Sequence, residues 1–170
     1  MENKLIVEGK VWKFGDDINT DIVVPGRYLT ITDPQELSKY TFQDIEPDFD
    51  KKVAVGDIVV GGKNFGCGSS REQAPLVLKT LGISAVVAES FARIFFRNAI
   101  NLGLPVVESP GITNTTENGH RLRISLEEGR IENLDTGETM KGTILPKFLI
   151  EIIRAGGAVD ALNSKIRNTK

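Results

Sequence analysis

The sequence predicts an α/β fold in which helices flank a partly parallel sheet and an antiparallel β lobe packs against it. Residues 53–108 alternate short apolar blocks with longer amphipathic segments, which indicates a β-α-β-α-β run. From residue 120 onward, apolar and polar residues alternate with a period of two, which is typical of antiparallel strands with one solvated face. The chain has 170 residues, the length of one domain, so we expect a single domain over residues 1–170.

The first fifty residues predict strand structure followed by loops. Residues 5–14 predict a strand pair, or one bulged strand, around Gly9. Residues 15–20 are rich in Asp, Asn and Gly and predict a turn, and residues 21–27 form a short apolar segment broken by a proline. Residues 33–50 predict a loop with a short helix, which we expect to act as a lid.

The β-α-β-α-β run supplies the predicted parallel strands. Its strands are expected at residues 53–60, 85–88 and 104–108, and its helices at residues 73–81 and 91–102. Ser90 stands where an N-cap of the second helix belongs, and Gly103 stands at the C′ position where that helix ends. One face of this helix carries three apolar residues and an asparagine: Phe91, Ile94, Phe95 and Asn98.

The last fifty residues predict hairpins and a helix. Residues 121–127 and 130–134 have the period of strands, and the turn DTGE at residues 135–138 is typical of a hairpin. A helix is expected at about residues 146–154. The polar end of the chain, about residues 165–170, is expected to be a flexible tail.

Residues 61–75, GGKNFGCGSSREQAP, are the most informative segment for function. The run is rich in glycine, which lets a backbone approach a ligand closely, and it precedes a predicted helix whose N-terminus favours an anion. Arg71 adds a planar fork that binds carboxylates. The same residues also fit a capped turn, because Ser69 and Ser70 precede Glu72 and Gln73 at capping-box spacing. Local chemistry leaves both interpretations open.

Composition disfavours several classes of protein. The loop has neither a Walker motif nor a Gly-x-Gly-x-x-Gly fingerprint, which disfavours nucleotide binding. The net charge is −2 with scattered Lys and Arg, so we expect no nucleic-acid partner. No segment has the length of a membrane span and the N-terminus does not resemble a signal peptide, so we expect no membrane association.

The chain has one cysteine, Cys67, and one histidine, His120. These are too few ligands for a zinc site or an iron–sulfur cluster, so a metal would have to come from another chain. A lone cysteine fits a reducing compartment, and we expect a cytoplasmic protein. An autonomous enzyme with Cys67 as nucleophile is the least favoured hypothesis, because the only histidine lies far along the chain in a polar segment that predicts a turn.

Four segments carry a resemblance to a known family. They are GDDINTDI at residues 15–22, PGRYL at 25–29, NFGCGSSRE at 64–72 and SFARIFFRN at 90–98. In this order and spacing they resemble the small subunits of 3-isopropylmalate dehydratases, which correspond to the swivelling domain of single-chain aconitases. The resemblance implies the swivelling β/β/α fold of the aconitase type.

The resemblance also implies a hydro-lyase that is active only with a large subunit. Members of the family remove and re-add water through an alkene, which here would interconvert 2-isopropylmalate and 3-isopropylmalate in leucine biosynthesis. It implies a small hydroxydicarboxylic acid as substrate, no cofactor bound by this chain, and a [4Fe–4S] cluster on the large subunit. The expected assembly is a heterodimer or a dimer of heterodimers.

The resemblance assigns roles to individual residues. Ser69 matches the catalytic serine that takes a proton from the carbon next to a carboxylate, and Asp21 matches an active-site acid. Arg71 and Arg27 match arginines that bind substrate carboxylates, and Ser70 is expected to bind the substrate with them. A serine hydroxyl is a weak base, so loop N–H groups, the helix N-terminus and Arg71 are expected to stabilise its alkoxide.

The other residues of these motifs are expected to support the site. The supporting loop residues are Asn64, Gly66, Cys67, Gly68 and Glu72. Arg93 and Arg97 are expected to be structural or to contact the large subunit.

Substrate choice is expected to depend on residues 30–32, which resemble a loop that meets the variable group of the substrate. Thr30 and Ile31 suit a small apolar branch such as isopropyl or methyl, and the segment has no arginine or lysine for a distal carboxylate. Isopropylmalate is therefore favoured, and small subunits acting on 2,3-dimethylmalate, citramalate or homoaconitate remain alternatives. A non-catalytic carboxylate-binding module is the alternative from a different class.

Overall fold

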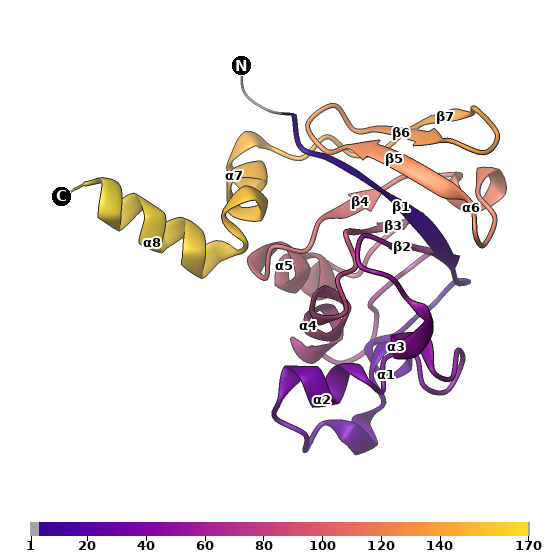
Figure 1. Ribbon diagram of the computed structural model, residues 1–170, viewed down its shortest axis with the longest axis horizontal. Coiled ribbons are helices and arrows are strands. Elements are labelled where there is room, and N and C mark those ends of the chain that lie inside the picture. The colour runs from indigo at the N-terminus through magenta and orange to yellow at the C-terminus, as the bar shows by residue number, and fades with distance from the viewer. Residues whose placement is uncertain (1–3, 170) are drawn as a thin grey trace.

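The computed structural model describes residues 4–169 and contains one seven-stranded mixed sheet. Its strand order is β4-β3-β2-β1-β5-β6-β7, so the first strand of the chain lies in the middle. Figure 1 shows the antiparallel strands at one end of the molecule and most of the helices beside the parallel strands. The predicted combination of a partly parallel sheet, flanking helices and an antiparallel lobe is confirmed.

The parallel half of the sheet is almost entirely apolar and buried in β2, β3 and β4, whereas β1 also carries charged, exposed residues. It contains β1 (Ile6–Lys13), β2 (Ile58–Gly61), β3 (Ala85–Ala88) and β4 (Val106–Glu108), each parallel to its neighbour. Every residue of β2 and β3 is buried, as expected where both faces of a parallel sheet are covered.

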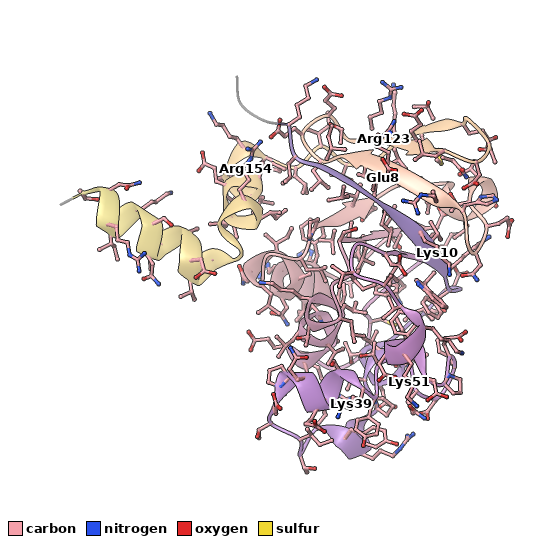
Figure 2. All side chains as sticks on the ribbon, viewed as in Figure 1. Glu8, Lys10, Lys39, Lys51, Arg123 and Arg154 are labelled. Carbon is pink, nitrogen blue, oxygen red and sulfur yellow. The ribbon has the colours of Figure 1, made fainter. Side chains whose placement is uncertain are left out.

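The antiparallel half continues from the other edge of β1. It contains β5 (Arg121–Ser125), β6 (Arg130–Asn133) and β7 (Thr139–Lys141). Arg123 of β5 lies opposite Glu8 of β1 and donates from Nε to its carboxylate at 3.1 Å, which places an ion pair on the solvated face (Figure 2). The period-two prediction from residue 120 is confirmed here.

Two helices of the predicted β-α-β-α-β run pack beside the parallel strands. These are α4 (Gln73–Thr80) and α5 (Arg93–Asn101), and Figure 1 shows both on the same side of the sheet. Gly103 has a φ of 80°, the left-handed conformation predicted for the residue that ends α5. The later helices are α6 (Ile112–Thr115), α7 (Lys147–Ala155) and α8 (Ala158–Asn168).

The segment before β2 forms short helices around an aromatic cluster. These helices are α1 (Thr20–Val23), the 3₁₀ helix η1 (Gly26–Tyr28), α2 (Pro34–Ser38) and α3 (Phe49–Lys52). Phe42 and Phe49 are fully buried, and their ring centroids lie 5.1 Å apart in an edge-to-face arrangement. The expected lid over residues 33–50 is thus anchored in the core, and lid movement would have to release these rings.

Several predicted boundaries were wrong. Residues 5–14 hold one continuous strand, β1. A Cβ atom at Gly9 would lie 1.9 Å from the carbonyl oxygen of Gly56, so the turn before β2 can pack against β1 only because residue 9 is a glycine. Residues 21–27 hold the end of α1 and the start of η1, separated by extended Val24 and Pro25, and the Asn19 side chain caps α1 by accepting a hydrogen bond from the N–H of Ile22.

Two further differences concern the ends of helices. The N-cap of α5 is Ala92 rather than the predicted Ser90, whose hydroxyl binds the glycine loop instead. The polar end of the chain continues as helix α8 through Asn168, and Figure 1 shows α8 projecting from the body beyond α7. The flexibility of residues 165–170 stays a prediction, and residue 170 lies outside the described residues. Within residues 4–169, no helix is long and apolar enough to cross a membrane.

Candidate active site

The glycine loop is held in place by the segment that precedes and forms α1. The N–H of Gly66 donates to the carbonyl of Ile18 at 2.7 Å, and the N–H of Thr20 donates to the carbonyl of Cys67 at 2.9 Å. The hydroxyl of Thr20 donates to the carbonyl of Ser69 at 3.0 Å. These hydrogen bonds therefore join the motifs at residues 15–22 and 64–72, which are far apart in the sequence.

The motif that leads into α5 holds the other side of the loop. The Ser90 hydroxyl accepts from the N–H of Asn64 at 2.8 Å, and the Ser90 carbonyl accepts from the N–H of Phe65 at 3.0 Å. The N–H of Ala92 then donates to the carbonyl of Phe65 at 2.9 Å. The Asn64 side chain donates to Asp17 at 3.1 Å, and its supporting role in the site stays a prediction.

Gly66 can be only a glycine in this arrangement. Its φ is 80°, and a Cβ atom would lie 2.2 Å from Cγ of Phe95 on α5. The loop backbone therefore lies directly on the first turns of α5. Gly68 also has a positive φ, 95°, which turns the chain toward Ser69.

A cavity of about 190 Å³ lies between the glycine loop and the start of α5. Ser69 and Ser70 are exposed at this cavity, and the Arg71 side chain is about one-fifth exposed. The residues that line the cavity are Thr20, Gly66, Gly68, Ser69, Ser70, Arg71, Ala92, Arg93, Ile94, Phe95 and Asn98. Three of the predicted site residues, Ser69, Ser70 and Arg71, are thus brought together.

The alternative interpretation of this segment as a capping box is wrong. The N-cap of α4 is Glu72, and no side chain caps the helix. At the α4 N-terminus, the N–H of Ala74 donates to the Arg71 carbonyl and Pro75 has no N–H, and the stabilisation expected from this helix end stays a prediction. Within residues 4–169, the N–H groups of Gly68, Ser69 and Ser70 donate to no protein acceptor, so the loop itself offers the free donors.

Asp21 fixes the Arg71 guanidinium although the two residues are 50 positions apart. Nη1 of Arg71 donates to Oδ1 of Asp21 at 3.0 Å and to the carbonyl of Val24 at 3.3 Å. The same Asp21 oxygen accepts from the N–H of Gly26 at 2.8 Å. The Gly26 hydrogen bond and then Arg71 lower the pKa of Asp21, and its carboxylate orients Arg71; its role as an active-site acid stays a prediction.

Arg27 lies outside the cavity lining. Its guanidinium forms two hydrogen bonds with the Asp44 carboxylate and lies 4.7 Å from the Tyr28 ring centroid. Its charge contributes to the lowered pKa of Asp21, so it is close enough to act electrostatically. Direct substrate binding by Arg27 would require it to release Asp44.

Thr30 and Ile31 also lie outside this cavity. Thr30 is exposed, and Ile31 lines a separate hollow of about 230 Å³. Glu72 and Gln73 line the same hollow, so it adjoins the end of the glycine loop. The predicted specificity residues are near the loop but do not face Ser69 across one cavity.

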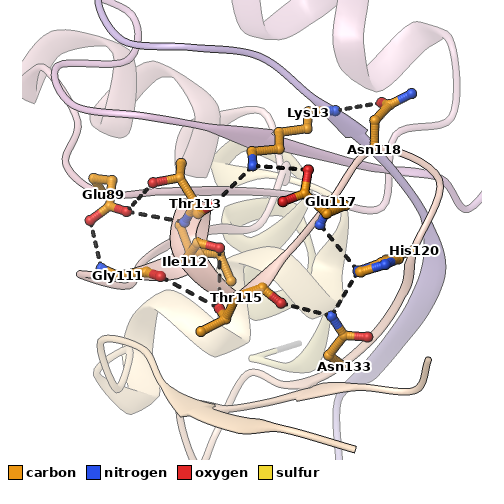
Figure 3. A network of polar contacts seen from close by, with 10 residues as sticks. All are labelled: Lys13, Glu89, Gly111, Ile112, Thr113, Thr115, Glu117, Asn118, His120 and Asn133. Atoms are coloured by element: carbon orange, nitrogen blue, oxygen red, sulfur yellow. Dashed lines mark hydrogen bonds and ion pairs between the residues drawn. The ribbon is translucent and has the colours of Figure 1, made fainter. Parts of the chain in front are cut away.

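Cys67 and His120 do not form a nucleophile and base. Burial, and then the charge of Asp17, raise the pKa of the Cys67 thiol, which disfavours the reactive thiolate. His120 belongs to a separate polar network with Glu117 and Asn133 (Figure 3): the N–H of Glu117 donates to Nδ1 of His120 at 3.1 Å, and the Asn133 amide lies 3.0 Å from the same atom. His120 therefore stabilises the turn before β5, as its polar sequence context predicts.

Sequence analysis missed one wall of the cavity. Arg93, Ile94 and Asn98 project from α5, and Thr20 joins the loop from α1. The sequence could have indicated this wall, because Ile94, Phe95 and Asn98 share one face of the predicted helix. Arg93 was expected to be structural or to contact the large subunit.

The described residues do not fit a resident metal cluster. Within residues 4–169, no three His, Cys, Asp or Glu side chains gather in a way that would hold a metal ion. An iron–sulfur cluster requires several cysteine ligands, and this chain has one.

Residues 15–110, which contain all four motifs, match the aconitase C-terminal domain family. This chain belongs to that family. It is 54% identical over 165 residues to the isopropylmalate/citramalate isomerase small subunit of Methanocaldococcus jannaschii, covering 97% of this chain and 98% of the relative. It is 56% identical over 154 residues to the 3-isopropylmalate dehydratase small subunit of Methanosarcina acetivorans, covering 91% and 94% of the two chains.

A solved structure places the fold in the same group. The crystal structure of a 3-isopropylmalate dehydratase from M. jannaschii superimposes with a TM-score of 0.91 at 42% identity, covering 97% of this chain and 98% of that one. The predicted aconitase-type fold is thereby confirmed. The chain is a small subunit of an aconitase-family hydro-lyase, and its relatives' designation as small subunits implies a large-subunit partner.

Proposed function

We propose that this chain supplies the proton-transfer half of a two-subunit lyase that interconverts 2-isopropylmalate and 3-isopropylmalate. The observation that carries the proposal is the placement of Ser69 beside Arg71 at a cavity, next to loop N–H groups without protein acceptors. The names of the relatives support isopropylmalate as the substrate.

The proposed mechanism begins with the substrate carboxylate on the Arg71 guanidinium, which Asp21 holds in a fixed direction. Oγ of Ser69 accepts the proton from the carbon next to that carboxylate. The N–H groups of Gly68, Ser69 and Ser70 are the donors available to stabilise negative charge at the reacting centre. The electron pair of the broken C–H bond forms the alkene as the C–O bond on the neighbouring carbon breaks, and the departing hydroxyl takes a proton from a donor that we place on the large subunit and leaves as water. In the return step, water gives one proton back to that donor and its hydroxyl to one alkene carbon, and Ser69 gives its proton to the other carbon.

The large subunit completes this proposal. We place the [4Fe–4S] cluster there, and we propose a heterodimer or a dimer of heterodimers working in the cytoplasm. In this assembly the small hydroxydicarboxylic acid is bound between the subunits. Arg27 would contribute a second carboxylate contact only after leaving Asp44.

Citramalate is the second candidate substrate. The M. jannaschii relative carries both isopropylmalate and citramalate in its name. Both have a small apolar branch, which Thr30 and Ile31 are proposed to meet when the partner covers this side of the loop. A pocket of this kind distinguishes one methylene by only about 1–3 kcal/mol, so activity on both substrates is compatible with the same residues.

The test is an anaerobic assay of alkene formation with this chain, the large subunit and their mixture. The mixture alone should be active, first with 2-isopropylmalate and then with citramalate. Ser69→Ala should lower kcat by about 10²–10⁴-fold. The free energy of unfolding should change by less than about 0.5 kcal/mol, because the side chain is exposed.

Ser70→Ala is the matched control, since it removes the same group one residue away. Loss of activity in Ser70→Ala but not in Ser69→Ala would overturn the assignment. Carboxylate binding by the isolated chain, with no activity in an assembled complex, would favour the non-catalytic module.

A further inference from the structure

A second hollow, outside the cavity at Ser69, lies along α5. It has a volume of about 270 Å³ and is lined by Phe91, Arg93, Phe96, Arg97 and Glu108; we call it the arginine hollow. Arg93 and Arg97 are one helical turn apart and both are exposed. Phe91 and Phe96 are half-buried with ring centroids 6.1 Å apart, so the hollow combines apolar rings with guanidinium groups.

The charge of the arginine hollow is not neutralised by residues 4–169. Neither Arg93 nor Arg97 forms an ion pair with a carboxylate of residues 4–169. Glu108, at the end of β4, is the only acidic residue in the lining and leaves one net positive charge. A carboxylate with a neighbouring apolar side chain would fit a hollow lined by two arginines and two aromatic rings, because arginine forms bidentate bonds with carboxylates and the rings offer apolar surface.

The arginine hollow adjoins the candidate active site. Arg93 lines both the hollow and the cavity at Ser69. Ile94, the next residue, lines the cavity and is 50% exposed. A chain seated in the hollow against Arg93 would therefore also lie next to the cavity at the start of α5.

We propose that an acidic segment of the large subunit docks in the arginine hollow, with a carboxylate between Arg93 and Arg97 and an apolar side chain against Phe91 and Phe96. This inference rests on the proposed function, because that function supplies the partner. Docking at this point would position the two subunits across the cavity at Ser69. In this arrangement Arg97 contacts the large subunit and does not touch the substrate.

The test measures the affinity of this chain for its large subunit under anaerobic conditions, by titrating this chain into a fixed amount of large subunit and following alkene formation. Arg97→Glu should raise the apparent Kd about tenfold, with kcat unchanged at saturation. Glu108→Gln should lower the apparent Kd about twofold, because it removes the one acid that opposes an acidic partner. Arg167→Glu, the same charge change on α8, is the matched control and should leave the Kd unchanged.

The opposite signs expected for Arg97→Glu and Glu108→Gln make the test selective. Tighter binding by Arg97→Glu together with weaker binding by Glu108→Gln would mean a basic partner segment and overturn the inference. Equal Kd values for Arg97→Glu and Arg167→Glu would also overturn it. An assembled wild-type complex without lyase activity would refute the proposed function, and direct binding measurements on the same variants would still test the docking surface.

Discussion

The ion pair between Asp21 and Arg71 allows a prediction that separates catalysis from stability. Asp21→Asn keeps the size of the side chain and an oxygen that can accept from Gly26 and Arg71, but removes the negative charge. Without that charge, the guanidinium is held less firmly in the direction of the cavity. We expect kcat/KM of the assembled enzyme to fall by about 10²-fold, the effect typical of a misplaced binding group.

The effect on stability should be much smaller. Hydrogen bonds to a charged group contribute about 1.5–3 kcal/mol and neutral ones about 0.5–1.5 kcal/mol. The Asp21 side chain is 62% exposed, and solvent screening reduces the difference. The expected loss in the free energy of unfolding at pH 7 is therefore about 1 kcal/mol or less.

This loss should depend on pH in one direction. The pKa of Asp21 is lowered in the folded chain from its usual 3.8, so its ionised form stabilises the fold above that value. The stabilisation disappears as the pH falls through the lowered pKa, whereas the amide side chain of the variant does not titrate. The difference between wild type and Asp21→Asn should therefore be complete at pH 7 and shrink steadily below pH about 4.

Urea unfolding between pH 7 and pH 3 and steady-state kinetics of the complex check both parts. Asp48→Asn is the control for the unfolding measurement, because it makes the same substitution in another exposed ion pair, with Lys51, that lies away from the cavity. A stability difference that is the same at pH 7 and pH 3 would refute the proposed origin of the lowered pKa. Unchanged kcat/KM in Asp21→Asn would refute the positioning of Arg71.

Two further predictions concern the glycine loop. Gly66→Ala should lower the free energy of unfolding, measured in urea, by about 3 kcal/mol, because a side chain at positive φ is strained and its Cβ atom would clash with Phe95. Gly137→Ala is the control, because Gly137 has a similar φ of 78° but no atom near its Cβ position, and it should cost only about 1 kcal/mol. Equal losses in the two variants would contradict the close approach of Gly66 to Phe95. Cys67→Ser should leave kcat of the complex unchanged, because the raised pKa of the thiol keeps it protonated, and a large loss of kcat would restore a catalytic role for Cys67.

The sequence predicted the parallel half of the fold because local patterns and burial agree there. Strands such as β3 are short, uniformly apolar and followed by a helix, and Gly103 marks a helix end by backbone geometry alone. The prediction failed where tertiary contacts decide the conformation. Gly9 suggested a break in a strand, but it permits the close approach of Gly56 to a continuous β1.

The candidate site was predicted only in part. The glycine loop and Ser69 follow from one contiguous motif, and the cavity confirms that Ser69, Ser70 and Arg71 lie together. Arg71 pairs with Asp21 from another segment, and a local sequence pattern cannot show that two residues so far apart in the chain lie in contact. Ser90 shows the same limit, since its N-cap position suits a helix although its hydroxyl binds the N–H of Asn64 in the loop.

The exposure of the site explains why this chain would be inactive alone. Ser69 is exposed, and an alkoxide in contact with water gains little from nearby dipoles, which act strongly only where water is excluded. Arg71 can still bind a carboxylate weakly in that state, because its orientation is set within the chain by Asp21. In the proposed mechanism, substrate binding can therefore precede full assembly, whereas proton transfer by Ser69 would require the partner to cover the cavity. The arginine hollow lies where that cover would have to begin, since Arg93 borders both surfaces.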